Sequence, residues 1–281
     1  MLCNDTTLKA TLTQFFALGQ TPQIQPVERD TKRNVKFCGR IRVVLILALD
    51  TCDARGSVAL LRDELLLHAT PHTSSEDYSS WLIPAVAHVL TTAGLTSRDI
   101  DLYTVAAGPG SFTGVRVGLT TVKAWSEVYG RPIAAVSRLE AIAAQGAASH
   151  PYVAAFIDAR RNQIFAALYR RQGVVLERVD EEMVIASDKF LEWCAANVAS
   201  QRTDWVSTDP HCVTQSPQWS SRLALGETVQ AVPPLLAPTI GHLGYRLARQ
   251  NRLTDALSLD ANYVRRSDAE LFWKGPPHYG A

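Results

Sequence analysis

Two apolar, strand-length runs in well-separated parts of the chain both end in aspartate. They span Val44–Asp50 and Val153–Asp158. An apolar, β-rich run of this length is typical of a buried strand. Each run is followed by further strand-like stretches and then by helices alternating with strands. The repetition predicts a duplicated α/β fold, in which two related lobes, each a mixed β-sheet flanked by helices, enclose a cleft.

Glycines, prolines and capping residues divide each unit into elements. In the first unit, strands are expected at 44–50, 56–61, 65–69, 100–106 and 133–136, and helices between Ser74 or Ser75 and Gly94, from 113 or 114 to about 129, and after Ser137. In the second, strands are expected at 153–158, 163–169, 174–178 and 205–207, and helices at 189–198 and 238–250. The domain prediction is an N-terminal extension at 1–42, a first lobe at 43–150 and a second lobe at 151–281. In an alternative, the last segment returns to the first lobe.

Residues 1–42 differ from the rest of the chain in charge. They carry seven basic and three acidic side chains, whereas the whole chain has a formal net charge of +1. We expect no secretory signal here, because the segment shows no uninterrupted apolar core followed by a small-residue cleavage site. Two interpretations stay open: a poorly ordered extension, or upstream sequence that is not translated because synthesis starts near Val43 or Val44. The segment is given no function.

Composition favours a packed, globular protein without a disulfide framework. Hydrophobic residues make up 47% of the chain, and the net charge of +1 gives no overall attraction for nucleic acid. The five cysteines show no C-x-x-C spacing, which favours reduced thiols over disulfides or a zinc ribbon. No apolar run reaches the roughly 18 residues needed to cross a bilayer. The expected location is the cytoplasm, without membrane contact.

The most distinctive segment is glycine-rich and spans Gly108–Gly118. It is expected to form a turn that leads into a helix N-terminus, where backbone amides and hydroxyls can hold an anion. The candidate nucleotide-binding residues in this segment are Gly108, Gly110, Ser111 and Thr113. The alternative is a tight strand-to-helix turn, in which glycine serves a positive φ or close packing.

The two strand-ending acids are further candidates for nucleotide binding. Asp50, followed by Thr51, ends the first strand, and Asp158 ends the equivalent strand of the second unit. Acids that face each other across a cleft can hold magnesium-ATP. Asp50, Thr51 and Asp158 therefore join the candidate nucleotide-binding residues. The alternative is that each acid braces the turn after its strand.

One histidine pair imitates a metal site. His68 and His72 have the i, i+4 spacing of a helical metal pair. Pro71 lies between them and disfavours helical geometry for the residue before it. We therefore expect no metal site in this chain and expect both histidines to be exposed to solvent.

The glycine-rich motif, taken with Leu47–Thr51, Ile157–Arg160 and Tyr263–Arg265, resembles the TsaB (YeaZ) family. The motifs occur in the family's order, and the resemblance covers the chain from about 44 to 274. It implies the actin-like ASKHA fold of two related lobes, which agrees with the duplication. It also implies a part in forming N6-threonylcarbamoyladenosine in the tRNAs that read codons starting with A.

The resemblance implies a non-catalytic subunit that requires no cofactor. Family members bind a catalytic paralogue, TsaD, and through that complex a small ATPase, TsaE, so tRNA is contacted only indirectly. A homodimer is implied where the partner is missing. The catalytic paralogue carries two metal-binding histidines in an H-x-E-x-H type motif. At the matching positions this chain has Arg138 and Ile142, whose side chains do not ligate metals, so the paralogue's metal site is expected to be absent.

The resemblance also implies that helices of the first lobe form the interface with TsaD. Small residues let another helix approach closely, and larger apolar residues fill the gaps. The candidate interface residues are Trp81, Val115, Gly118, Leu119 and Val122. The alternative is that several of them pack beneath the sheet of their own lobe.

Two enzyme hypotheses compete with the scaffold. An ATP-binding or ATP-hydrolysing enzyme of the same fold requires Asp50 and Asp158 to hold metal and nucleotide, and weak binding of ATP or ADP is its milder form. The chain lacks the G-G-x-x-A-N adenosine motif of the catalytic paralogue. A glycoprotease-like peptidase requires Ser111 as nucleophile. However, the loop lacks the G-x-S-x-G order, and no histidine is placed by sequence to activate this serine.

Overall fold

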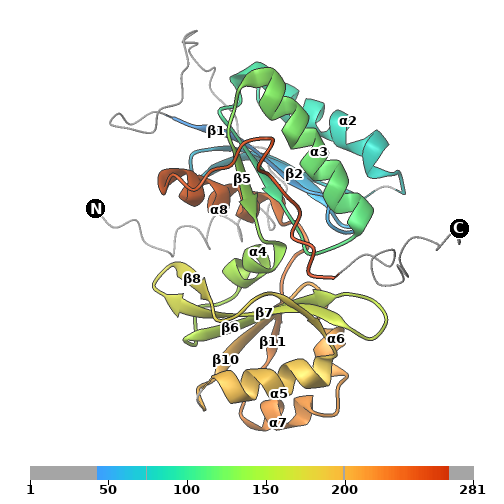
Figure 1. Cartoon of the computed structure of the whole chain (residues 1–281), viewed down its shortest axis with the longest axis vertical. Helices are drawn as coiled ribbons and strands as arrows, with labels where there is room; N and C mark the ends of the chain where they lie inside the picture. Colours follow the sequence, from blue (N-terminus) through green and yellow to red (C-terminus); the bar gives the residue numbers. More distant parts are fainter. Residues whose placement is uncertain (1–42, 74, 199, 266–281) are drawn as a thin grey trace, which may run out of the picture. The chain divides into compact units, whose positions relative to one another are not determined.

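The computed structural model describes residues 43–73, 75–198 and 200–265. The predictions made for residues 1–42, for Ser74 and for residues 266–281 lie outside these described residues. Within them, the strands form two sheets with helices packed against each (Figure 1). No helix in the described ranges is long and apolar enough to span a membrane.

The first sheet has the strand order β3-β2-β1-β4-β5. Its strands are β1 (Leu45–Asp50), β2 (Ser57–Arg62), β3 (Leu65–Pro71), β4 (Leu102–Ala106) and β5 (Ile133–Val136). β2 runs antiparallel to β1 and β3, whereas β4 runs parallel to β1 and β5. β1 is buried along its whole length, as is typical of a central strand that is covered on both faces.

The second sheet repeats this topology. Its strand order is β11-β10-β6-β7-β8, with β9 paired to β7. The strands are β6 (Tyr152–Asp158), β7 (Ile164–Gln172), β8 (Val175–Arg178), β9 (Met183–Ile185), β10 (Thr203–Ser207) and β11 (Val229–Ala231). β6 is antiparallel to β7 and parallel to β10, so it corresponds to β1. The predicted duplication is therefore confirmed in strand order and direction, and Asp158 is the counterpart of Asp50.

Helices cover both faces of the first sheet. The helices are α2 (Tyr78–Thr92), α3 (Phe112–Tyr129), α4 (Arg138–Gln145), α5 (Ser187–Asn197), α6 (His211–Thr214), α7 (Trp219–Ala224) and α8 (Ala237–Arg249), with a short 3-10 turn η1 (Ser97–Asp99). α2 and α3 lie side by side on one face, and α8 packs on the other (Figure 1). α4 follows a strand of the first sheet but contacts β6, β7 and β10 of the second. It therefore connects the two sheets.

Helix α8 packs against the first sheet although it follows the last strand of the second. A Cβ atom added at Gly241 would lie 2.4 Å from Cδ1 of Leu61, and one added at Gly244 would lie 2.1 Å from Cγ2 of Thr104. The helix backbone therefore lies directly on the strands, as in the alternative in which the last segment returns to the first lobe. The lobe boundaries at 43–150 and 151–281 stay a prediction.

Some elements differ from the sequence-based expectation. α2 begins at Tyr78 with Asp77 at its N-cap, later than the Ser74 or Ser75 start that we expected. The segment before it is held as a loop, because Nε2 of His72 lies 2.9 Å from the carbonyl oxygen of Glu76. The elements β9, α6, α7 and β11 were not predicted. Each spans only three to six residues, too few to show a periodicity.

The close approach of α8 can be tested at Gly244. In Gly244→Ile the new side chain would collide with Thr104 on β4, so we expect the free energy of unfolding to fall by about 1–3 kcal/mol, a common cost of overpacking. Arg249→Ile places the same residue at an exposed position of the same helix and is expected to change stability by less than about 0.5 kcal/mol. Urea unfolding of both variants measures the difference. Equal stability of the two would contradict the direct packing of α8 on the sheet.

Candidate functional site

Asp50 ends β1 and is completely buried. One carboxylate oxygen accepts a hydrogen bond from the backbone N–H of Cys52 at 2.9 Å, and the other lies 3.3 Å from Nε of Arg138. The Thr51 hydroxyl donates to the carbonyl oxygen of Gly114 at 2.6 Å. Both predicted nucleotide-binding residues at this strand end therefore have partners within the protein. These contacts agree with the alternative in which the acid braces the turn.

The glycine-rich loop lies against the same turn. A Cβ atom at Gly110 would lie 2.3 Å from the carbonyl oxygen of Cys52, and one at Gly114 would lie 2.1 Å from that of Thr51. Gly108 has a φ of +113°, which side-chain-bearing residues rarely adopt. The glycines are therefore explained by close backbone packing and by a positive φ.

Backbone amides of this loop also have protein partners. The N–H of Ser111 donates to the carbonyl oxygen of Cys52 at 2.6 Å. The Ser111 hydroxyl is the N-cap of α3 and accepts a hydrogen bond from the N–H of Gly114 at 3.4 Å. Thr113 is exposed on the first turn of the helix. The anion cradle predicted for this loop stays a prediction, and two of its amides already serve the fold.

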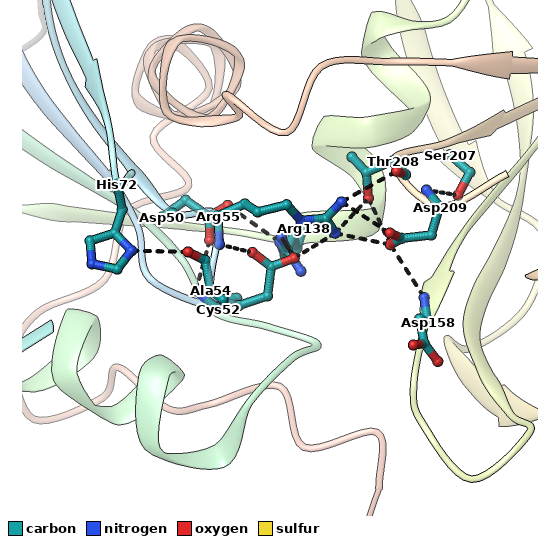
Figure 2. A network of polar contacts seen from close by, with 12 residues as sticks. Asp50, Cys52, Ala54, Arg55, His72, Arg138, Asp158, Ser207, Thr208 and Asp209 are labelled. Carbon is teal, nitrogen blue, oxygen red and sulfur yellow. Dashed lines mark hydrogen bonds and ion pairs between the residues drawn. The ribbon is translucent and has the colours of Figure 1, made fainter. Parts of the chain in front are cut away.

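Arg138 is the central side chain of the site. It begins α4, and its side chain is only 1% exposed. Its Nε lies 3.3 Å from Oδ2 of Asp50, and its Nη2 lies 2.6 Å from Oδ2 of Asp53 (Figure 2). A buried charge of this kind is tolerated only when it is paired. One guanidinium therefore pairs with two carboxylates.

The charges of this site are fixed at neutral pH. Burial raises the pKa of Asp53. Its attraction to Arg138 and its hydrogen bonds with Arg138 and Arg55 outweigh this effect and lower the pKa to about 2. Burial lowers the pKa of Arg138, but the carboxylates of Asp50 and Asp53 raise it above its ordinary value. Burial and the charge of Asp50 raise the pKa of the Cys52 thiol well above its usual range. The thiol is thus protonated and is a poor nucleophile.

Arg55 extends these ion pairs to the second sheet. Its Nη1 lies 3.0 Å from Oδ1 of Asp209 and its Nη2 lies 3.1 Å from Oδ2, which is the two-pronged geometry of a strong arginine–carboxylate pair. The same Nη2 is 3.0 Å from Oδ2 of Asp53. Asp209 follows β10 and accepts a long hydrogen bond of 3.5 Å from the N–H of Asp158. Alternating charges therefore connect the ends of β1, β6 and β10 (Figure 2).

The two strand-ending acids have separate protein partners. The carboxylate of Asp158 points away from this network (Figure 2). Its Oδ1 accepts from the N–H of Arg160 at 2.7 Å, and its Oδ2 is 3.3 Å from Nη1 of Arg160. The side chains of Arg138 and Arg55 lie between Asp50 and the second sheet. A role of Asp50 and Asp158 in binding nucleotide stays a prediction, and the contacts give each acid another purpose.

The expectation that both paired histidines are exposed was wrong for His72, and His68 is only partly exposed. Its side chain is buried, with Nδ1 2.9 Å from the carbonyl oxygen of Ala54. Its ring packs against Tyr78 and Trp81, at centroid distances of 4.6 and 4.8 Å. The position of Pro71 between the two histidines argued against a helix, but it gave no information about whether their side chains are buried. Among the described residues, no group of three or more His, Cys, Asp or Glu side chains is placed to hold a metal ion.

Most of the predicted interface residues lie on the inner side of α3. Val115, Leu119 and Val122 are buried, and a Cβ atom at Gly118 would lie 2.5 Å from the hydroxyl of Thr51. The alternative of packing beneath the sheet accounts for this burial. Trp81 on α2 is partly exposed. An interface role for these five residues stays a prediction. A partner that binds α3 would have to contact the side of the helix that faces away from the sheet.

Three residues of the charged network escaped the sequence analysis. Asp53 and Arg55 lie just after the first strand, and Asp209 follows the short strand β10. Arg138 was weighed only as a residue that ligates no metal. The sequence signal for this network was the charge of Arg138. Arg138 directly follows a buried strand and the helix cap Ser137, and a cation buried at such a place needs an acid as partner.

The ion pairs of Arg138 predict a strong effect of removing its charge. Arg138→Met removes the arginine partner of the buried Asp50 carboxylate and leaves Asp53 paired with Arg55 alone, so we expect a loss of about 3–5 kcal/mol in the free energy of unfolding. The exposed pair offers a matched control: Arg160→Met is expected to cost less than about 1 kcal/mol.

Acid unfolding tests the same pairing. Because the pKa of Asp53 is lowered from 3.8 to about 2, its contribution to stability is complete above about pH 4 and is lost as the pH falls towards 2. This part of the pH dependence is expected to shrink in Arg138→Met. Unchanged stability and an unchanged acid transition in this variant would contradict the assigned ion pairs.

Comparisons with known proteins agree with this fold. The family model described as "TsaD: tRNA N6-adenosine threonylcarbamoyltransferase" matches residues 68–220. The "tRNA threonylcarbamoyladenosine biosynthesis protein TsaB" of Bacillus subtilis is 35% identical over 228 residues, which are 81% of this chain and 97% of the relative. The protein of the same description from Escherichia coli is 36% identical over 129 residues, or 45% of this chain and 55% of the relative.

A solved structure shows the same architecture. "YeaZ from Pseudomonas aeruginosa" has a TM-score of 0.62 and 24% sequence identity, and the match covers 78% of this chain and 99% of that one. The two sheets of matching strand order, flanked by helices, are the actin-like ASKHA fold expected from the sequence. With the Bacillus subtilis relative matched over nearly its full length, the chain belongs to the TsaB (YeaZ) family.

Proposed function

We propose that this chain is a non-catalytic subunit of the machinery that forms N6-threonylcarbamoyladenosine in tRNA. The names of its Bacillus subtilis and Escherichia coli relatives support the pathway. The match of a TsaD family model to residues 68–220 supports a common fold with the catalytic enzyme. In this proposal the chain pairs with a TsaD-like paralogue, which carries out the chemistry. A TsaE-like ATPase binds through that complex.

The observation that carries the non-catalytic role is the buried guanidinium of Arg138. It lies 3.3 Å from the carboxylate of Asp50 and 2.6 Å from that of Asp53. A divalent cation or a nucleotide–metal complex at these acids would have to displace a paired, buried arginine. Removing one partner of such a pair costs several kcal/mol, so the protein's own cation competes strongly with any metal.

The rival enzyme hypotheses find less support in the geometry. For an ATPase, Asp50 and Asp158 must both present free carboxylate oxygens to metal, but both acids are held by protein groups. For a peptidase, Ser111 must donate its proton to a base, but its hydroxyl caps α3. All three residues serve the local fold.

The outer surface of α2 and α3 supports the pairing proposal. α2 contains no charged side chain, and its exposed residues repeat at helical spacing along one side: Ser80, Ile83, Pro84, Ala87 and Thr91. α3 has a similar uncharged strip of exposed and partly exposed residues: Val117, Thr120, Thr121, Ala124 and Val128. The two helices are neighbours on the sheet (Figure 1). Depletion of charge is typical of the centre of a protein interface, and we assign this surface to the TsaD-like paralogue.

A reconstituted transfer assay tests the proposed function. It contains the TsaD-like paralogue, the TsaE-like ATPase, threonylcarbamoyl-adenylate, tRNA and this chain, and each protein is omitted in turn. We expect tRNA modification to require this chain and expect the chain alone to modify nothing. Equal modification without the chain would overturn the proposal. Micromolar, magnesium-dependent ATP binding by the isolated chain in calorimetry would instead favour the ATPase.

The interface is tested at Ile83, which is 53% exposed on α2. Ile83→Arg introduces a charge into the uncharged strip, and we expect the affinity for the paralogue to fall at least tenfold, or about 1.4 kcal/mol. Val175→Arg is the matched control, because Val175 is also 53% exposed but lies on β8 of the second sheet. Calorimetric titration with the paralogue measures both. Unchanged binding by Ile83→Arg would contradict an interface on α2. If the variant loses only self-association, the surface belongs to a homodimer.

A further inference from the structure

Four arginines lie on three segments of the chain that the contacts of Tyr263 and Arg265 connect to one another. They lie in α3, in the turn between β6 and β7, and in the stretch 261–265 that follows α8. They are Arg116, Arg160, Arg161 and Arg265. The proposed function uses none of them. We call them, with Phe112 and Tyr263, the arginine–aromatic surface.

Close contacts connect the first part of this surface. The Phe112 and Tyr263 rings are stacked with their centroids 5.1 Å apart, and the two residues are 40% and 43% exposed. The guanidinium carbon of Arg116 lies 3.6 Å from the Phe112 ring centroid, and Nε of Arg116 donates to the Tyr263 hydroxyl at 2.9 Å. An exposed pair of large rings is thus combined with an exposed cation.

Arg265 connects this group to the turn of the second sheet. It lies two residues after Tyr263, so their Cα atoms are at most about 7 Å apart. Its Nη1 donates to the carbonyl oxygen of Ala159 at 2.9 Å, and its Nη2 donates to Oε1 of Gln163 at 2.7 Å. Arg265 therefore clamps both sides of the turn that carries Arg160 and Arg161.

That turn has an unusual backbone. Arg160, Arg161 and Asn162 have φ values of +63°, +55° and +55°, a region that residues with a side chain seldom occupy. Consecutive residues in this region are costly and persist where the surrounding structure holds them. Here the strained turn presents two exposed arginines. The first two of these positions are thus occupied by arginines, although glycine would adopt this backbone more easily.

The charge of the three segments is entirely positive. Residues 111–123, 159–163 and 261–265 contain no aspartate or glutamate. Acids in contact with these segments among the described residues include Asp158, which pairs with Arg160 at 3.3 Å, and Asp260, whose carboxylate accepts the N–H of Ala261 at 2.7 Å. Glu182 also contacts them, because its Oε2 accepts a hydrogen bond from Nδ2 of Asn262 at 2.6 Å. These three segments therefore contribute basic but no acidic side chains, on a chain with a formal net charge of +1.

We propose that the arginine–aromatic surface binds an RNA strand with unpaired bases. Arginines bind phosphate oxygens through charge-assisted hydrogen bonds, and exposed rings provide faces on which unpaired bases stack. An acidic protein partner would use the arginines but would gain little from the stacked rings. The inference goes beyond the proposed function, in which contact with tRNA belongs to the partner, and it gives this chain a direct contact of its own.

The test measures RNA binding by the isolated full-length chain. The probe is a fluorescein-labelled tRNA anticodon stem-loop, followed by fluorescence anisotropy in low salt. We expect a dissociation constant of roughly 1–100 μM that weakens with salt, as for binding dominated by phosphate contacts. The triple variant Arg116→Glu/Arg160→Glu/Arg161→Glu is expected to bind at least tenfold more weakly. Phe112→Ala is expected to weaken binding to the stem-loop at least threefold but to leave binding to a fully paired RNA of equal length unchanged.

A control of equal charge separates this surface from a general effect. Arg98→Glu/Arg202→Glu/Arg249→Glu changes three exposed arginines elsewhere and is expected to alter RNA affinity less than threefold. Thermal unfolding of each variant establishes that it is folded. Equal losses in the two triple variants, or no binding by the wild-type chain, would overturn the proposal. Loss of paralogue binding with RNA affinity unchanged would also overturn it and would make the surface a protein interface. Neither result depends on the transfer assay.

Discussion

The structure depends on one buried guanidinium held between two carboxylates. Asp50 ends the central strand of the first sheet, where helices on both faces exclude water. A carboxylate in that position needs a cation, and Arg138 supplies it from the first residue of α4. Because α4 packs on the second sheet, the ion pair also fixes the end of β1 relative to that sheet. Arg55 adds a second link through its two-pronged pair with Asp209.

Close packing holds together the strand end, the glycine-rich loop and the following helix. Glycines at 110 and 114 bring the loop against the carbonyl oxygens of Cys52 and Thr51. Protein groups occupy the oxygens of Asp50. The charges of Asp50 and Asp53 are thus balanced by the protein's own arginine.

The fold was largely predictable, because strand-length apolar runs and helix caps recur in the same order in both halves. The cap at Ser137 and the strand Ile133–Val136 were predicted at the observed positions. The candidate site was less predictable. Sequence showed that Arg138 ligates no metal, but its partners Asp53 and Asp50 depend on how α4 meets β1. Likewise, spacing along α3 selected Val115 and Leu119 as apolar, yet periodicity does not say which apolar side meets the sheet and which meets a partner.

The exposed surface of α3 has two chemically different parts. Along its length the helix exposes small and uncharged residues that suit a dry protein interface. At its N-terminus Phe112 and Arg116 meet Tyr263, a group that suits phosphates and unpaired bases. On the two proposals made above, a single helix would bind the catalytic partner along one strip and RNA at its end. The subunit would then contribute by holding partner and substrate at a fixed separation, which requires a rigid helix and no chemistry of its own.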